Sequence, residues 1–329
     1  MIRRRTPRIA VLGGGTGLST MLRGLKNHSD NITAVVTVTD DGGGSGVLRR
    51  EMHMPPPGDI RNCIQALANA EPAMQEMMNY RFHDGSLAGQ SLGNLLLAAL
   101  YDMSPSFDAA VARLSQVLAI TGQVLPVTNE NIALLARFSD GAEIRGETTI
   151  TDYKIHSGAV IERIMLTPAA PPALPAVLDA IERADMIVLG PGSLYTSVIP
   201  NLLTEGVAEA VCRSKAVKAY VMNVMTQPGE TEGYTGADHL RALIDHGGEG
   251  LFRHVLVNSR PIPPEVAAAY EKGRAVPVTA TADEVLAFGA QPVFEPVAAW
   301  AGGLIRHNPA ELSRALMNIY YENAETRTV

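Results

Sequence analysis

The sequence predicts an α/β protein with a mainly parallel sheet between two layers of helices. Short apolar runs without polar alternation occupy residues 9–12, 32–38 and 186–189, as in strands that are buried on both faces. Glycine-rich turns follow these runs, and stretches with helical periodicity separate them. Because this alternation is typical of parallel β-α-β units, we expect a Rossmann-like three-layer sandwich.

The first third of the chain opens with an expected strand at residues 8–13, a helix at 18–26 and a second strand at 32–38. Residues 40–58 are rich in glycine and proline, which predicts a long functional loop rather than regular structure. Periodicity and capping residues then predict three helices, at residues 59–68, 92–103 and 107–118.

The middle of the chain changes pattern between residues 123 and 167. Short β-like stretches there predict an antiparallel embellishment, with a hairpin at Asp140-Gly141. Its expected strands are residues 124–127, 132–138, 143–150 and 160–166.

From residue 171 the α/β alternation resumes. Strands are expected at residues 186–189, 217–224 and 254–257. Helices are expected at residues 174–184, 207–214, 237–245, 264–272, 282–288 and 310–321. With no repeat or low-complexity linker, the chain predicts a single α/β domain over residues 1–329, with 123–167 as a β-rich embellishment inside it.

Composition narrows the class of protein. The 329 residues carry a net charge of −7, which disfavours nucleic acid as a partner. The two cysteines are far apart and lack C-x-x-C spacing, so we expect free thiols and a cytoplasmic location. No apolar stretch is long enough to span a membrane. We also expect a homo-oligomer.

The three glycine turns indicate one ligand site, because loops at the carboxyl ends of parallel strands share one edge of the sheet. The first turn is neither a dinucleotide fingerprint, which needs glycine where Leu18 stands, nor a P-loop, which needs G-K-[ST]. Its threonine could cap the next helix while its hydroxyl contacts a phosphate or ribose. The candidate residues of this turn are Gly13, Gly14, Gly15, Thr16 and Gly17.

The second and third turns supply the other candidates. Asp40 and Asp41 end the second strand, where carboxylates bind ribose hydroxyls, hold Mg²⁺ or cap the strand end. A carboxamide after a later strand suits recognition of a base or sugar. The further candidates are Gly42, Gly43, Gly192, Ser193 and Asn223.

Two other features could suggest catalysis or metal binding, but we interpret neither as a functional site. Residues 89–93 match G-x-S-x-G, but no clear strand precedes them, so Ser91 is expected to cap the helix that follows. The eight histidines lack metal-binding spacing, and His53 and His83 have no assigned role.

Six segments together resemble the YvcK-type gluconeogenesis factors, the bacterial branch of the CofD-like superfamily. They are residues 11–17, 36–46, 55–62, 91–95, 189–201 and 221–231. Two positions depart from the family pattern: Gly44 replaces a serine, and Gln90 stands where relatives often have histidine.

The resemblance implies a cytoplasmic protein that binds UDP-sugars such as UDP-N-acetylglucosamine or UDP-glucose. It also implies a regulator of cell shape and envelope synthesis during gluconeogenic growth, with envelope-synthesis proteins as partners and no established turnover. Tyr270 and Arg306 match family positions associated with UDP-sugar binding. A tyrosine can stack on uracil, and an arginine can pair with a pyrophosphate.

Two alternatives stay open. One is an enzyme like 2-phospho-L-lactate transferase, the sister branch, with Asp40 and Asp41 as ligands of Mg²⁺. The other is an NAD-dependent oxidoreductase, which the β-α-β start suggests and the incomplete fingerprint disfavours.

Overall fold

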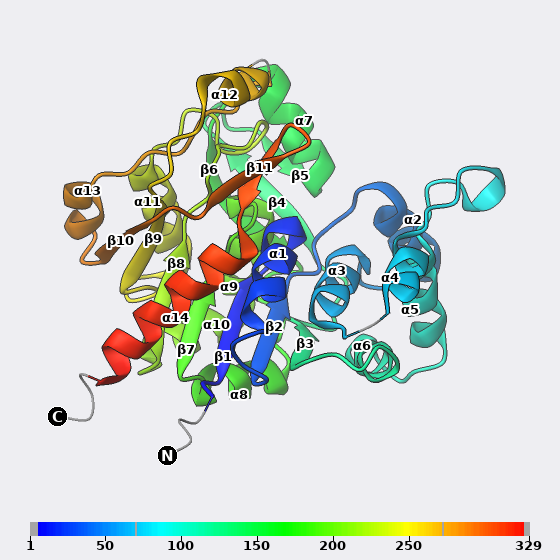
Figure 1. Ribbon diagram of the computed structural model, residues 1–329. Coiled ribbons are helices and arrows are strands. Elements are labelled where there is room, and N and C mark those ends of the chain that lie inside the picture. Colours follow the sequence, from blue (N-terminus) through cyan, green and yellow to red (C-terminus); the bar gives the residue numbers. More distant parts are fainter. Residues whose placement is uncertain (1–5, 70, 272, 326–329) are drawn as a thin grey trace.

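A seven-stranded, fully parallel sheet forms the centre of the protein (Figure 1). The computed structural model describes residues 6–69, 71–271 and 273–325. The sheet order is β10-β9-β8-β7-β1-β2-β3. These strands are β10 (Gln291–Glu295), β9 (His254–Asn258), β8 (Val217–Val221), β7 (Met186–Leu189), β1 (Ile9–Gly13), β2 (Ile32–Val36) and β3 (Gln123–Pro126).

The direction of the chain across the sheet reverses between β1 and β7. From β1 the chain proceeds outward to β2 and β3, and it later returns to the opposite side of β1 as β7 before continuing to β8. Loops that leave two such strands turn to opposite sides, which opens a crevice at their carboxyl ends. The first and third glycine turns follow these two strands.

Helices cover both faces of the sheet, as the predicted three-layer sandwich requires. On one face, α1 (Gly15–Leu25) packs against α3 (Gly58–Leu67) and α14 (Pro309–Glu325). Behind the sheet in Figure 1 lie α8 (Pro175–Arg183), α9 (Ile199–Leu202) and α10 (Val207–Arg213). The remaining helices of this half are α11 (Gly236–Gly247), α12 (Pro264–Glu271) and α13 (Ala282–Ala287).

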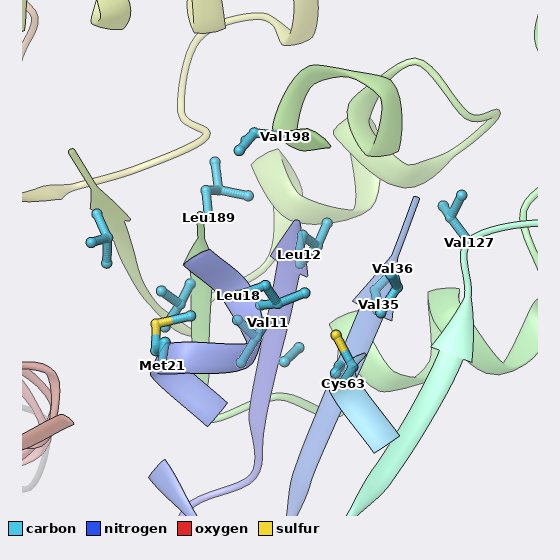
Figure 2. Packing of buried hydrophobic residues seen from close by; sticks show 14 of the residues in the cluster. Val11, Leu12, Leu18, Met21, Val35, Val36, Cys63, Val127, Leu189 and Val198 are labelled. Atoms are coloured by element: carbon cyan, nitrogen blue, oxygen red, sulfur yellow. The ribbon is translucent and has the colours of Figure 1, made fainter. Parts of the chain in front are cut away.

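The core follows from the apolar runs. Every residue of β1 and β7 is buried, and the first apolar positions of α1 close over β1. Figure 2 shows Leu18 and Met21 of α1 beside Val11, with Cys63 of α3 near Val35. The strands therefore read as uninterrupted apolar segments because helices cover them on both sides.

The predicted embellishment is partly right. A three-stranded antiparallel sheet does form from β4 (Ala133–Phe138), β5 (Glu143–Arg145) and β6 (Ile161–Thr167). Residues 124–127, however, belong largely to β3 at the edge of the parallel sheet. Residues 147–150 begin helix α7 (Glu147–Ser157) instead of extending a strand, because contacts from a distant loop stabilise this helix start.

The predicted loop at residues 40–58 was also wrong in part, since it contains helix α2 (Gly43–Met52). Gly42 is extended and Gly43 has a φ of +46°, so the glycines form the sharp entry to the helix. His53 then ends α2 in the left-handed conformation. The adjoining helical region comprises α4 (Pro72–Asn79), α5 (Leu92–Asp102), α6 (Phe107–Val117) and the short turn η1 (Gly85–Leu87).

Among the residues that the structure describes, no helix combines the length and apolar character that a membrane crossing requires. Ser91 caps α5 as predicted, because its side chain accepts a hydrogen bond from the Asn94 backbone. His83 makes an edge contact with the ring of Tyr80.

Candidate functional site

The first and third glycine turns lie against each other at the carboxyl ends of β1 and β7. A Cβ atom on Gly17 would lie 2.8 Å from the carbonyl oxygen of Pro191, and one on Gly192 would lie 3.0 Å from the carbonyl oxygen of Gly14. These approaches leave little room for a side chain at either position. The two turns can therefore pack this closely only because glycine stands at both positions.

A cavity of about 540 Å³ opens at this contact. Its size is that of a small-molecule site. The predicted residues that line it are Gly15, Thr16, Gly17, Gly192, Ser193, Asn223, Tyr270 and Arg306. The cavity is covered by α12 and by a hairpin of β11 (Ala298–Ala301) and β12 (Leu304–His307).

This cover has its own small apolar cluster, separate from the main core. Val224, Ala298 and Ile305 are buried in it, and Tyr270 packs against them. The Tyr270 hydroxyl also accepts a 2.6 Å hydrogen bond from the backbone of Ile305. The ring of Tyr270 is thus held at the wall of the cavity.

Arg306 lies near the end of the sequence but contacts the first glycine turn. Its Nη1 donates a 2.7 Å hydrogen bond to Oγ1 of Thr16, while the residue as a whole remains exposed. The guanidinium has five N–H donors, so this single bond leaves donors to face the cavity. Helix α1 starts at the same turn, and the first N–H groups of a helix have no acceptor within it.

Two of the predicted residues have side chains that are already engaged. The Asn223 carboxamide accepts from the Gly192 N–H (3.4 Å) and donates to the Gly192 carbonyl (2.9 Å). The Ser193 hydroxyl donates to Oε1 of Gln227 at 2.7 Å. Asn223 therefore shapes the third turn, and recognition of a base or sugar by its carboxamide stays a prediction.

The second glycine turn lies outside this cavity, and its two aspartates serve different elements. Oδ1 of Asp41 accepts from the backbone N–H (3.0 Å) and the hydroxyl (2.8 Å) of Thr148, in the first turn of α7. A carboxylate is favourable at a helix N-terminus. Asp40 instead accepts from the Gly42 N–H at 2.9 Å, and a Cβ on Gly58 would lie 3.2 Å from its other oxygen. Gly42 and Gly43 lead into α2, and Gly13 and Gly14 lie behind the cavity wall.

Three carboxylates that interact with Asp40 or with one another were not predicted as site residues. Asp59, in the first turn of α3, accepts a 2.6 Å hydrogen bond from the Gly15 N–H. Glu230 accepts from the backbone of Tyr195 (3.0 Å) and Thr196 (2.9 Å), and its second oxygen has no hydrogen-bond partner. Glu147 is the first residue of α7. With Asp40 they form what we term the carboxylate group, beside the Gly14-Gly15 turn.

Burial disfavours the charged forms of these acids, and repulsion by neighbouring carboxylates adds to this for Asp59 and Glu147. Loss of hydration raises the pKa of Asp59 to about 6, of Glu230 to about 7 and of Glu147 to about 8. The charge of Asp40 adds to the upward shift for Asp59 and Glu147, and burial raises the pKa of Asp40 itself. Within the described residues, no group of three or more His, Cys, Asp or Glu side chains is arranged to hold a metal ion.

Gly44 and Gln90 lie next to each other. A Cβ on Gly44 would lie 2.9 Å from Oε1 of Gln90 and 3.2 Å from the carbonyl oxygen of Gly89. Gln90 is buried and its Oε1 has no hydrogen-bond partner. The missing side chain at position 44 therefore makes room for the glutamine.

Comparison with known proteins identifies the family of the chain. Residues 9–298 match the protein family described as 2-phospho-L-lactate transferase CofD. The gluconeogenesis factor of Bacillus subtilis is 45% identical over 317 residues, with 96% of this chain and 99% of that protein covered. The gluconeogenesis factor of Halalkalibacterium halodurans is 45% identical over 310 residues, with 94% and 95% covered.

A solved structure shares the whole fold. The crystal structure of a UPF0052 family protein from Bacillus halodurans superposes with a TM-score of 0.91 at 45% identity, covering 94% of this chain and 99% of that chain. The sheet order, the crevice between β1 and β7 and these matches lead to one conclusion: the chain belongs to the CofD family, in the branch of the gluconeogenesis factors.

Proposed function

We propose that the 540 Å³ cavity binds a nucleotide sugar, UDP-N-acetylglucosamine or UDP-glucose. The protein would then act in the cytoplasm as a regulator that relates nucleotide-sugar supply to cell shape and envelope synthesis during gluconeogenic growth. In this proposal it works as a homo-oligomer with envelope-synthesis proteins as partners. No turnover is needed for such a role.

One observation carries the proposal: Arg306 is fixed over the start of α1, where the two glycine turns meet. The start of α1 supplies N–H groups and the positive end of the helix dipole, and both favour phosphate. Gly17 and Gly192 let the two turns pack closely against each other, which supports a pyrophosphate site shared by both turns. Arg306 adds a charge-assisted donor on the open side.

The part of the cavity wall around Tyr270 suits a base. Tyr270 presents an aromatic ring that is held by its hydrogen bond to Ile305. Small residues surround it, because Ala269, Gly273 and Ala275 also line the cavity. A flat heterocycle could therefore stack on the ring, with the diphosphate at the turns and the sugar beyond it.

Isothermal titration calorimetry tests the proposal. The ligands are UDP-N-acetylglucosamine, UDP-glucose, UDP, GDP and NAD, each with and without Mg²⁺. We expect the UDP-sugars to bind and to stabilise the fold by roughly 2.7 kcal/mol when present at 100 times Kd. Tyr270→Ala should bind at least tenfold more weakly, whereas Tyr101→Ala, at a site outside the cavity, serves as the control. NAD binding without UDP-sugar binding would contradict the proposal.

The carboxylate group favours a second candidate function, transfer of a phospholactyl-type group with Mg²⁺. Magnesium is commonly held by one or two carboxylates together with substrate phosphates. Asp41 accepts two hydrogen bonds from Thr148, whereas Asp40 and Asp59 accept backbone bonds from Gly42 and Gly15. The charge of Asp40 also acts directly on Asp59, so these two carboxylates are the pair that a cation would join. We therefore propose Asp40 and Asp59 as the Mg²⁺ ligands, in place of the pair Asp40 and Asp41 that the sequence predicts. A Mn²⁺ titration of the nucleotide-loaded protein should show one site that Asp40→Asn weakens and Asp41→Asn does not.

A further inference from the structure

A second, smaller cavity lies at the opposite ends of helices α1 and α3. Its volume is about 190 Å³. It is formed by the last turn of α1, by α3 and by α4, and its lining residues are Arg23, Lys26, Gln65, Ala66, Gln75 and Asn79. We term it the helix-end cavity. None of these residues lines the nucleotide cavity.

The helix-end cavity carries two positive charges and no carboxylate in its lining. Neither Arg23 nor Lys26 forms an ion pair with a carboxylate in the part of the chain that the structure describes. Burial and the nearby charge of Arg23 both lower the pKa of Lys26. The one hydrogen bond of the Lys26 ammonium, to the Ala68 carbonyl at 2.8 Å, leaves two of its three donors.

A buried amide adds an independent observation. Gln65 is only 8% exposed, and its Nε2 has no hydrogen-bond partner. Buried amide groups are nearly always hydrogen-bonded, so each exception needs an explanation. Here Gln65 lines the same cavity as the two cations. An acceptor placed between them would satisfy all three groups.

We propose that the helix-end cavity binds a phosphate group, either inorganic phosphate or the phosphate of a small monoester. Two neighbouring positive charges match a dianion, and guanidinium, ammonium and amide donors are the groups that recognise phosphate oxygens. A volume of about 190 Å³ holds a phosphate with at most a short organic substituent. The charge pattern favours such a ligand over a monocarboxylate.

Helices α1 and α3 connect this site to the nucleotide cavity. Helix α1 begins at Gly15 in the first glycine turn, and α3 carries Asp59, which accepts the Gly15 N–H. The same two helices pack along their length and end at the helix-end cavity. A phosphate that bridges their far ends would fix their relative position, so we expect it to change UDP-sugar affinity. Any such coupling is reciprocal, and this step rests on the proposed function.

Phosphate titration followed by thermal unfolding tests the site. The full chain is titrated with phosphate, methyl phosphate and acetate at constant ionic strength. We expect a saturable rise in melting temperature with either phosphate but not with acetate. A larger effect of methyl phosphate than of inorganic phosphate would identify a monoester as the ligand.

Three variants locate the effect. Arg23→Gln and Lys26→Gln should each raise the concentration for half-maximal effect at least tenfold. Arg241→Gln, at an exposed position on α11, should respond as the wild type does. An unchanged response in Arg23→Gln, whose exposed side chain is not needed for folding, would overturn the proposal.

Calorimetric titration with UDP-N-acetylglucosamine, with and without saturating phosphate, then tests the coupling. We expect phosphate to change the Kd in wild type and not in Arg23→Gln. Equal values in wild type would refute the coupling. If no UDP-sugar binds while the Arg23-dependent response to phosphate persists, the proposed function fails and the phosphate site stands.

Discussion

Replacing Arg306 with alanine should weaken UDP-sugar binding sharply and leave the fold nearly unchanged. In the free protein this exposed side chain makes one hydrogen bond, to the Thr16 hydroxyl, so its removal should cost well under about 1 kcal/mol of stability. In the complex it would lose a charge-assisted contact with the pyrophosphate. Such a contact contributes about 1.5–3 kcal/mol, so Kd should rise roughly tenfold to a hundredfold.

The assay is calorimetric titration with UDP-N-acetylglucosamine, together with a thermal unfolding curve for each variant. Arg306→Lys keeps the charge but not the planar fork, so its Kd should fall between those of the wild type and the alanine variant. Arg314→Ala removes an exposed arginine from α14 and is the matched control. If Arg306→Ala binds like the wild type, the bond to Thr16 only anchors the hairpin, and our assignment of the pyrophosphate position is wrong.

Three further predictions concern residues that support the structure around the site. Gly17→Ala places a Cβ 2.8 Å from the Pro191 carbonyl oxygen, so UDP-sugar affinity should drop at least tenfold by calorimetry while circular dichroism stays native; unchanged affinity would refute a tight contact between the turns. Asp41→Ala removes the acceptor of two bonds at the start of α7 and should cost about 1 kcal/mol in urea unfolding, with a smaller loss for Asp41→Asn. Burial lowers the pKa of His307 to about 4. As the pH falls below about 6.5, the imidazole therefore becomes protonated in the unfolded chain before it does so in the folded protein. The free energy of unfolding should therefore fall by about 2 kcal/mol between pH 7.5 and 5 because of His307 alone. A His307→Gln variant whose urea unfolding shows the same pH dependence as the wild type would contradict this prediction.

The sheet and two of its three turns could be predicted from local signals. Uninterrupted apolar runs identify buried parallel strands, and glycines after them identify close backbone approach. The order of strands places the first and third turns together, because β1 and β7 lie on either side of the reversal. The match to gluconeogenesis factors over almost the whole chain confirms the resemblance that these segments carry.

The carboxylate group could not be predicted in the same way. Asp59 resembled a capping residue in sequence, and its contact with Gly15 joins residues that are 44 positions apart. Glu147 stands at the start of a helix whose β-branched residues resemble a strand, and Asp41 stabilises that helix start from 107 positions away. Glu230 lies in a loop, and only the fold brings it to the backbone of Tyr195. Local patterns do not contain such contacts.

The contact between Gly44 and Gln90 makes the side chain tolerated at one position depend on the other. A serine at position 44 would bring its Cβ to within 2.9 Å of the glutamine oxygen and 3.2 Å of the Gly89 carbonyl oxygen, so this substitution alone requires the glutamine to move. A substitution at position 44 should therefore be tolerated best when position 90 is changed with it.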